Sequence, residues 1–80
     1  MGEKPYYRVQ SARRAIEILK AFQPEHRLWG VTELSHHLGL SKSVVHRLLL
    51  TLEEEGFVQR DPQTGAYRLG LESYQLGMVY

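Results

Sequence analysis

The sequence predicts a single, mainly α-helical domain with a small β-hairpin. Three observations support this fold class: apolar residues recur at helical spacing in several segments, glycines separate those segments, and two short β-prone runs flank a polar stretch at 61–65. A length of 80 residues, with 42% apolar and 24% charged residues, suits one folded domain rather than a disordered chain. The absence of cysteine excludes a disulfide scaffold and a Cys-based zinc finger, so packing alone must stabilise the fold.

The first helix is expected over Ala12–Phe22, with Ser11 as its N-cap. Pro24 and the polar residues after it end this helix. The short apolar segment Leu28–Trp29 then suits an extended strand, and Trp29 is expected in the core. The apolar stripe of this helix comprises Ala12, Ala15, Ile18, Leu19 and Phe22.

The second helix should be short and run over about Val31–Leu38. Gly30 is an acceptable N-cap because Glu33 stands at the third helical position, where its carboxylate can bond back to the cap. Gly39 is the expected C-terminal stop. The residues expected to face inward are Val31, Leu34 and Leu38.

The third helix should be longer and have a clear buried face. Ser41 is its N-cap candidate, the helix is expected over Lys42–Glu55, and Gly56 should stop it as the residue after the C-cap. The acidic cluster Glu53–Glu55 is expected to be a solvated helix end without a function. The buried stripe comprises Val45, Leu48, Leu49 and Leu52.

A β-hairpin should follow the third helix directly. Residues 57–60 and 66–69 are expected as its two strands, joined by the turn formers of 61–65. Leu71, Tyr74 and Met78 then lie at helical spacing and predict a fourth helix that is unfinished at Tyr80. Two helices joined by a tight turn, with a hairpin after the second, form a winged helix-turn-helix. We therefore expect a basic N-terminal arm at 1–8, the winged helix-turn-helix at 9–70 and the start of a linker helix at 71–80.

The distribution of charge predicts a nucleic-acid partner better than the net charge of +1 does. Four basic residues lie between Met1 and Arg14, against Glu3 alone. From Ser35 to Thr51 the only charged residues are Lys42 and Arg47. Segments with at most one acid leave a surface that repels phosphate little.

Counting 100° per residue from the buried Val45 gives the outer face of the third helix, whose start would enter the major groove of DNA. On that face Ser43 and His46 can bond base edges or phosphates, and Lys42 and Arg47 can neutralise phosphate. Val44 suits contact with a thymine methyl group, whereas Leu50 has no evident partner on DNA. The full predicted DNA-binding set is Ser41, Lys42, Ser43, Val44, His46 and Arg47 on this helix, Gln10, Ser11 and Arg14 at the start of the first helix, and Arg60, Thr64 and Arg68 on the wing.

An ordered series of short motifs resembles the DNA-binding domain of the IclR family of bacterial transcription regulators. The resemblance covers about Val9 to Met78, and the combination is specific where any single motif would be weak. The motifs are Val9–Ser11 with Arg14–Ala15, Val31–Ser35, Gly39–Ser43, His46–Leu49, Leu52–Glu53, Gly56–Val58 and Tyr67–Gly70.

The resemblance implies a homodimeric or tetrameric regulator that represses or activates operons in response to a small molecule. It implies that a linker helix and a larger effector-binding domain, absent here, follow this domain, and that dimer contacts involve the first helix and the linker helix. Third helices related by the two-fold axis of a dimer would read half-sites about one turn apart, so a near-palindromic duplex operator is the expected partner. The lack of a long apolar stretch or signal segment predicts a cytoplasmic location. Two departures are Gly30, where the family often has Ser or Thr, and Val44, where Thr is common; Val44 removes one potential hydrogen bond to a base.

Other functions are less consistent with the sequence. Histidines 36, 37 and 46 lack the spacing and the carboxylate of a metal site, so no metal or other cofactor is expected. Residues Ser41, Ser43, His46 and Asp61 lack the sequence context of a hydrolase, so no enzyme activity is expected. The longest aliphatic run, Leu48–Leu50, is too short to span a membrane. The main alternative is a winged helix that binds another protein, which would tolerate acids on the outer face of the third helix.

Several apolar or aromatic residues have more than one open interpretation. Tyr6 and Tyr7 suit packing against DNA sugars, a disordered arm or a dimer contact. Ile16 and Leu50 lie on otherwise polar faces, which suits a subunit contact or simple tolerance of an exposed aliphatic side chain.

Overall fold

A computed structural model describes residues 9–80 of the chain. It contains four helices and one two-stranded antiparallel hairpin, which confirms the predicted fold class. The arm predicted at 1–8, with Tyr6 and Tyr7, lies outside the described residues. The elements are α1 (Gln10–Ala21), α2 (Val31–Leu38), α3 (Lys42–Glu54), β1 (Val58–Arg60), β2 (Tyr67–Leu69) and α4 (Leu71–Val79).

Helix α1 begins two residues before the predicted start, so the assignment of Ser11 as its N-cap was wrong. Val9 is the N-cap residue, in an extended conformation, and its carbonyl accepts a hydrogen bond from the Arg13 N–H at 3.1 Å. No side chain caps this end. A serine cap favours a boundary by only about 1 kcal/mol, and water can satisfy the N–H groups of an exposed first turn. The helix ends at Ala21 because Phe22 turns to an extended backbone.

Helices α2 and α3 follow the prediction closely. The Gly30 N–H donates to Glu33 Oε1 at 3.1 Å, and Gly39 ends α2 with a φ of +69°, which a residue without Cβ adopts easily. The Ser41 hydroxyl oxygen accepts from the Val44 N–H at 3.2 Å and caps α3. Helix α3 ends at Glu54, one residue earlier than expected.

Ser35 fixes the turn between α2 and α3. This buried residue donates its hydroxyl to the Leu40 carbonyl at 2.5 Å, and its own carbonyl accepts from the Leu40 N–H at 3.1 Å. Both bonds hold the residue that leads into α3 against the last turn of α2. The angle at which α3 leaves α2 is therefore set by a buried polar contact as well as by apolar packing.

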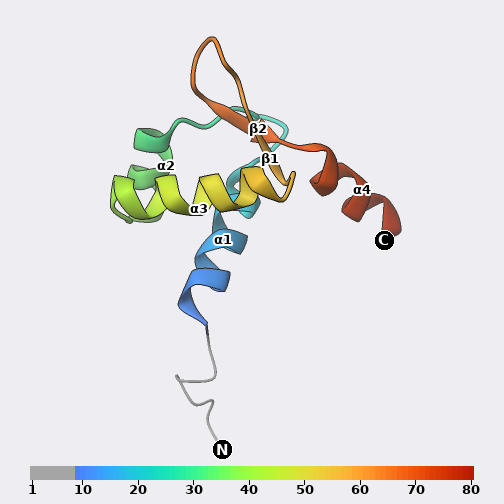
Figure 1. The fold of residues 1–80 in the computed structure, drawn as a ribbon, viewed down its shortest axis with the longest axis horizontal. Helices are drawn as coiled ribbons and strands as arrows, with labels where there is room; N and C mark the ends of the chain where they lie inside the picture. Colours follow the sequence, from blue (N-terminus) through green and yellow to red (C-terminus); the bar gives the residue numbers. More distant parts are fainter. Residues whose placement is uncertain (1–8) are drawn as a thin grey trace, which may run out of the picture.

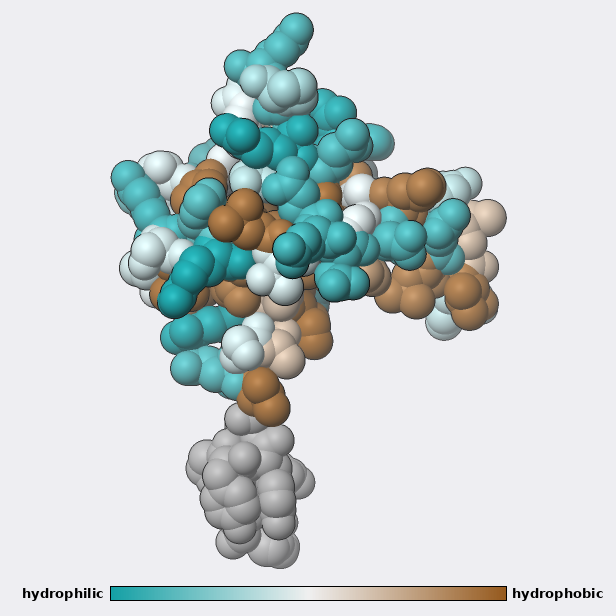
Figure 2. Space-filling view, viewed as in Figure 1, coloured by the Kyte–Doolittle hydropathy of each residue, from teal (hydrophilic) through white to brown (hydrophobic). Residues whose placement is uncertain are grey.

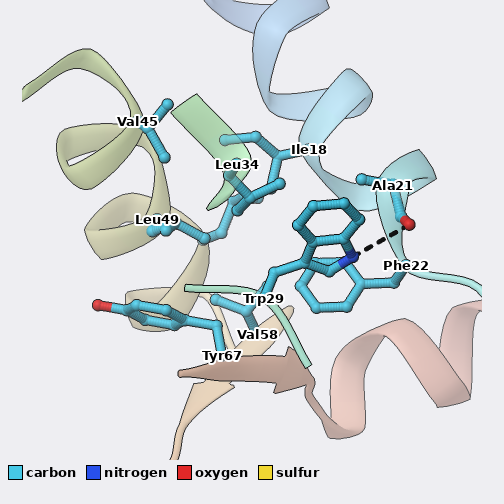
Figure 3. Close-up of a cluster of buried hydrophobic side chains, with 10 residues drawn as sticks. Ile18, Ala21, Phe22, Trp29, Leu34, Val45, Leu49, Val58 and Tyr67 are labelled. Atoms are coloured by element: carbon cyan, nitrogen blue, oxygen red, sulfur yellow. Dashed lines mark hydrogen bonds between the residues drawn. The ribbon is translucent and has the colours of Figure 1, made fainter. Parts of the chain in front are cut away.

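One core lies where α1, α2, α3 and the hairpin meet (Figure 3). Figure 3 shows the Trp29 indole against the end of α1, where its Nε1–H donates to the Ala21 carbonyl at 3.1 Å. That bond satisfies the one polar atom of a side chain that is only 6% exposed. The buried apolar residues are Ile18, Ala21, Phe22, Trp29, Leu34, Val45, Leu49, Leu52, Val58 and Tyr67.

A single residue, Trp29, pairs with the side of β2 that faces away from β1. Strands β1 and β2 pair from Val58 opposite Leu69 to Arg60 opposite Tyr67. On the other side of β2, Trp29 and Tyr67 exchange two backbone bonds of 2.9 and 2.8 Å. The strand predicted at Leu28–Trp29 is therefore only a single bridge in the structure. This bridge connects the α1–α2 connection to the wing.

Helix α4 leaves the hairpin through a close contact of two glycines. A Cβ on Gly70 would collide with the Gly56 carbonyl oxygen. The Gly70 N–H and the Ser73 hydroxyl both donate to the Phe57 carbonyl, at 2.9 and 2.8 Å. Figure 1 shows α4 projecting to one side of the three-helix unit. Among residues 9–80, none of the helices combines the length and apolar character needed to cross a bilayer.

Candidate nucleic-acid interface

The outer face of α3 carries the residues that the helical-wheel count predicted. Ser43, His46, Arg47 and Leu50 are all exposed, opposite Val45 and Leu49 on the buried face. Lys42 is also exposed, and Val44 is half-buried at the edge of the face. The geometry thus brings polar and basic side chains together on one rigid helix.

The start of α3 is suited to anionic ligands. Its first turn contains no acidic residue, and the Ser41 and Ser43 hydroxyls lie 3.4 Å apart beside the exposed N–H groups of that turn. Within residues 9–80, no carboxylate lies within 4.0 Å of the charged groups of Lys42 or Arg47. These two cations are therefore not neutralised by the described part of the chain.

The two wing arginines lie on opposite faces of the hairpin. Residues paired across antiparallel strands share a face, so Arg60 lies with Tyr67 on the face that packs on the core. Arg68 lies with Gln59 on the outer face. Burial and the nearby Glu53 raise the pKa of Tyr67, whereas Arg60 on the same face lowers it. The sequence suggested a pair of flanking arginines, but the hairpin does not bring them together.

Asp61 is the residue at the wing that sequence reasoning missed. Its carboxylate accepts from the Gln63 N–H at 3.1 Å and from the Thr64 hydroxyl at 3.0 Å. Hydrogen bonds from Gln63 and Thr64, together with the charge of Arg68, hold the pKa of Asp61 below its usual range, although desolvation opposes this. An aspartate followed within three residues by threonine is a common turn-capping pattern, so a signal was present in the sequence.

Thr64, predicted to reach the DNA backbone, is part of this wing turn. Its hydroxyl donates to Asp61 Oδ2 and its oxygen accepts from the Ala66 N–H at 3.2 Å. The side chain is exposed, but the hydroxyl proton is already in use. A role for Thr64 on DNA remains a prediction.

The start of α1 is the third predicted phosphate site. Gln10 and Ser11 are exposed, and Arg14 is half-buried one turn further on. Figure 1 places this end of α1 far from the wing tip, with α3 between them. Figure 2 shows hydrophilic residues over the wing, hydrophilic residues interspersed with hydrophobic ones over α3, and hydrophobic residues gathered on α4.

The histidines considered for a metal site have different surroundings. His46 is on α3, His36 is exposed on α2, and His37 packs against the Trp29 ring at 4.9 Å between centroids. His26, in the α1–α2 connection, stacks on the same indole at 3.6 Å, with Glu33 Oε2 3.5 Å from its Nε2. Within residues 9–80 no three potential ligands are grouped.

Comparison with known proteins identifies the domain. The model of the IclR helix-turn-helix domain matches residues 11–62. The glycerol operon regulatory protein of Streptomyces coelicolor is 39% identical over 72 residues, which are 90% of this chain and 28% of that protein. The transcriptional repressor IclR of Escherichia coli is 31% identical over 90% of this chain and 26% of its own length. The chain thus spans about a quarter of these relatives.

Solved structures give the same result. An IclR family transcriptional regulator from Brucella abortus superposes with a TM-score of 0.90 at 32% identity, over 99% of this chain and 30% of that one. An IclR-type transcriptional regulator from Alicyclobacillus acidocaldarius has a TM-score of 0.85 at 38% identity, over 90% of this chain and 29% of that one. On the match of residues 11–62, supported by these structures, the chain belongs to the IclR helix-turn-helix domain family.

Proposed function

We propose that this chain is the DNA-reading domain of a transcriptional regulator and binds duplex DNA sequence-specifically, with α3 in the major groove. The observation that carries the proposal is the outer face of α3, where exposed Ser43, His46 and Arg47 face solvent and no acid occurs before Glu53. A helix with such a face can approach a polyanion and form hydrogen bonds to base edges. The alternative of a protein-binding winged helix is not favoured by a face without carboxylates.

Each predicted residue has a role in this proposal. Ser43 and His46 contact base edges, Val44 touches a thymine methyl group, and Lys42 and Arg47 contact phosphates. Phosphate contacts from the wing and from the first turn of α1 set the register of α3 in the groove. These outlying contacts come from Arg60, Thr64 and Arg68, and from Gln10, Ser11 and Arg14, with Ser41 adding its hydroxyl at the start of α3.

We further propose that the intact regulator is a homodimer that acts in the cytoplasm on a near-palindromic operator. Two α3 helices related by a two-fold axis would enter major grooves about one helical turn apart. The relatives are more than three times as long as this chain, which leaves room for a small-molecule effector to act through another domain. The exposed apolar residues of α4 support a subunit contact there.

Selection of bound duplexes from a random pool, at two salt concentrations, tests the proposal. We expect a consensus with two symmetric half-sites, and weak binding by the isolated domain. Arg47→Ala should weaken binding to all sequences and flatten the salt dependence, because it removes a phosphate contact.

Ser43→Ala is the matched variant for base reading. It should weaken the free energy of DNA binding by about 1–3 kcal/mol, and mainly at one base position, because the contact from Ser43 reads only that base. Equal losses on selected and random DNA would remove Ser43 from the base-reading set. Chemical shift changes that map away from α3 in a titration with duplex would overturn the proposed interface.

A further inference from the structure

The turn of the wing contains a carboxylate that the proposed function does not use. Asp61 follows β1, and its side chain is only 18% exposed. Oδ1 accepts from the Gln63 N–H at 3.1 Å, and Oδ2 accepts from the Thr64 hydroxyl at 3.0 Å. Its backbone closes the same turn, through Asp61 N–H to the Ala66 carbonyl at 2.7 Å and Gly65 N–H to the Asp61 carbonyl at 2.8 Å. The position of the carboxylate is therefore fixed by the turn.

The same carboxylate faces one of the two wing arginines. Asp61 Oδ2 lies 3.8 Å from Arg68 Nη2, a diagonal contact between neighbouring strands on the outer face of the hairpin. Arg60 lies on the other face, with its guanidinium beside Gly65. No carboxylate of residues 9–80 lies within 4.0 Å of Arg60. The wing thus carries one arginine that is paired and one that is not paired within this region.

We propose that Asp61 is a positioning residue that competes with DNA phosphate for Arg68, and so limits the wing's contribution to affinity. The inference rests on the proposed function. An ionised carboxylate attracts the guanidinium as a phosphate does, so Arg68 must give up Asp61 before it can bind the backbone in full. Arg60 has no such competitor among the described residues and acts as the stronger phosphate contact of the wing.

Removing the charge while keeping the turn isolates this effect. Asp61→Asn retains an oxygen that can accept from Gln63 or Thr64, but it no longer holds Arg68 by charge. At low salt we expect about a two- to fivefold gain in affinity for a random duplex, since an ion pair with a half-exposed arginine at 3.8 Å is weak. The slope of log affinity against log salt should steepen by up to about 0.9, the value for one added phosphate contact.

Four further variants complete the test. Arg68→Gln in the Asp61→Asn background should abolish the gain. Glu25→Gln removes an exposed carboxylate of the α1–α2 connection and should leave affinity near the wild-type value. In the presence of Asp61, Arg68→Gln should lower affinity less than Arg60→Gln does. Both of these variants keep Asp61 and its turn, so the comparison holds even if Asp61→Asn folds poorly.

The outcomes separate this inference from the proposed function. A wild-type chain that binds no duplex, random or selected, would overturn both. Wild-type binding that weakens with Asp61→Asn, or a gain that survives in the double variant, would overturn the inference alone. Equal losses from Arg68→Gln and Arg60→Gln would do the same.

Discussion

At the start of α3, two serines of the same chemistry have different structural roles. The Ser41 hydroxyl oxygen accepts from the Val44 N–H, whereas Ser43 has only the 3.4 Å contact with Ser41. We expect Ser41→Ala to lower the free energy of unfolding by about 1 kcal/mol, the usual value of a helix cap. Ser43→Ala should change it by less than about 0.5 kcal/mol, as an exposed substitution does. Urea unfolding followed by circular dichroism measures both, and equal losses would show that the cap bond contributes nothing.

The carboxylate of Asp61 should make stability depend on pH in the acid range. Hydrogen bonds from Gln63 and Thr64 lower its pKa in the folded state, so folding favours the ionised form. The stabilisation is therefore present above the ordinary carboxyl range and is lost as the pH falls below about 4, through the lowered pKa. Asp61→Asn lacks this ionisation.

Thermal unfolding between neutral and strongly acid pH checks this pH dependence. The melting temperature of the wild type should fall more steeply than that of Asp61→Asn below about pH 4. Their difference should be largest at neutral pH. Parallel curves for the two proteins would mean that the turn does not favour the charged carboxylate.

At the scale of elements, the junction of α4 with the hairpin depends on close backbone contact. A Cβ on Gly70 would meet the Gly56 carbonyl oxygen, which is held by the bond from the Glu72 N–H at 3.1 Å and cannot move freely. We expect Gly70→Ala to destabilise the domain by about 1–3 kcal/mol, as overpacking usually does. Its φ of −96° is ordinary, so the cost is steric rather than conformational.

Gly77 provides the matched control within the same helix. Nothing lies within 4 Å of a Cβ added there, and the residue is in the interior of α4. Gly77→Ala should stabilise the helix by about 0.5–1 kcal/mol, because alanine loses less backbone entropy on folding. Thermal unfolding of both variants tests the pair, and a Gly70→Ala protein as stable as the wild type would contradict the close contact.

Helix ends that depend on a glycine or on a capping side chain could be predicted from the sequence. Gly39 and Gly56 both adopt positive φ where helix ends were expected, and Ser41 forms the expected cap bond. The start of α1 could not be placed, because Ser11 is a good cap by type, yet nothing in the sequence forbids the helix from starting two residues earlier. The strands became shorter than expected, since the Phe57 N–H bonds to the Leu52 carbonyl at the end of α3 instead of joining the sheet.

Contacts between distant parts of the chain were beyond sequence reasoning. The outer face of α3 followed from a 100° step alone, so Ser43, His46 and Arg47 were identified together. The bridge between Trp29 and Tyr67 joins residues 38 positions apart, and no local pattern marks it. Arg60 and Arg68 lie on opposite faces because of the register of the hairpin. The length of the loop did not determine that register, so the sequence could not predict the two faces.

For the whole molecule, the distribution of surfaces separates DNA contact from subunit contact. Figure 2 shows hydrophilic residues over the wing and among a few hydrophobic ones over α3, whereas hydrophobic residues dominate on α4 at the side of the molecule. Helix α4 contains no buried residue, and its large apolar side chains are 62–80% exposed. In the proposed dimer, a second copy of the chain covers these side chains. The exposed apolar residues of α4 are Leu71, Tyr74, Leu76, Met78 and Val79.

Binding to duplexes with one or two half-sites should therefore distinguish the two surfaces. Leu76→Ser removes an exposed apolar side chain of α4 that lies outside the predicted DNA-binding set. We expect it to leave affinity for one half-site unchanged and to lower cooperative binding to two half-sites about tenfold, which corresponds to about 1.4 kcal/mol. Leu28→Ser is the control, because Leu28 is an exposed apolar residue of the α1–α2 connection and not part of α4. Cooperativity that survives Leu76→Ser but fails with Leu28→Ser would move the subunit contact from α4 to the α1–α2 connection, and with it the predicted spacing of the half-sites.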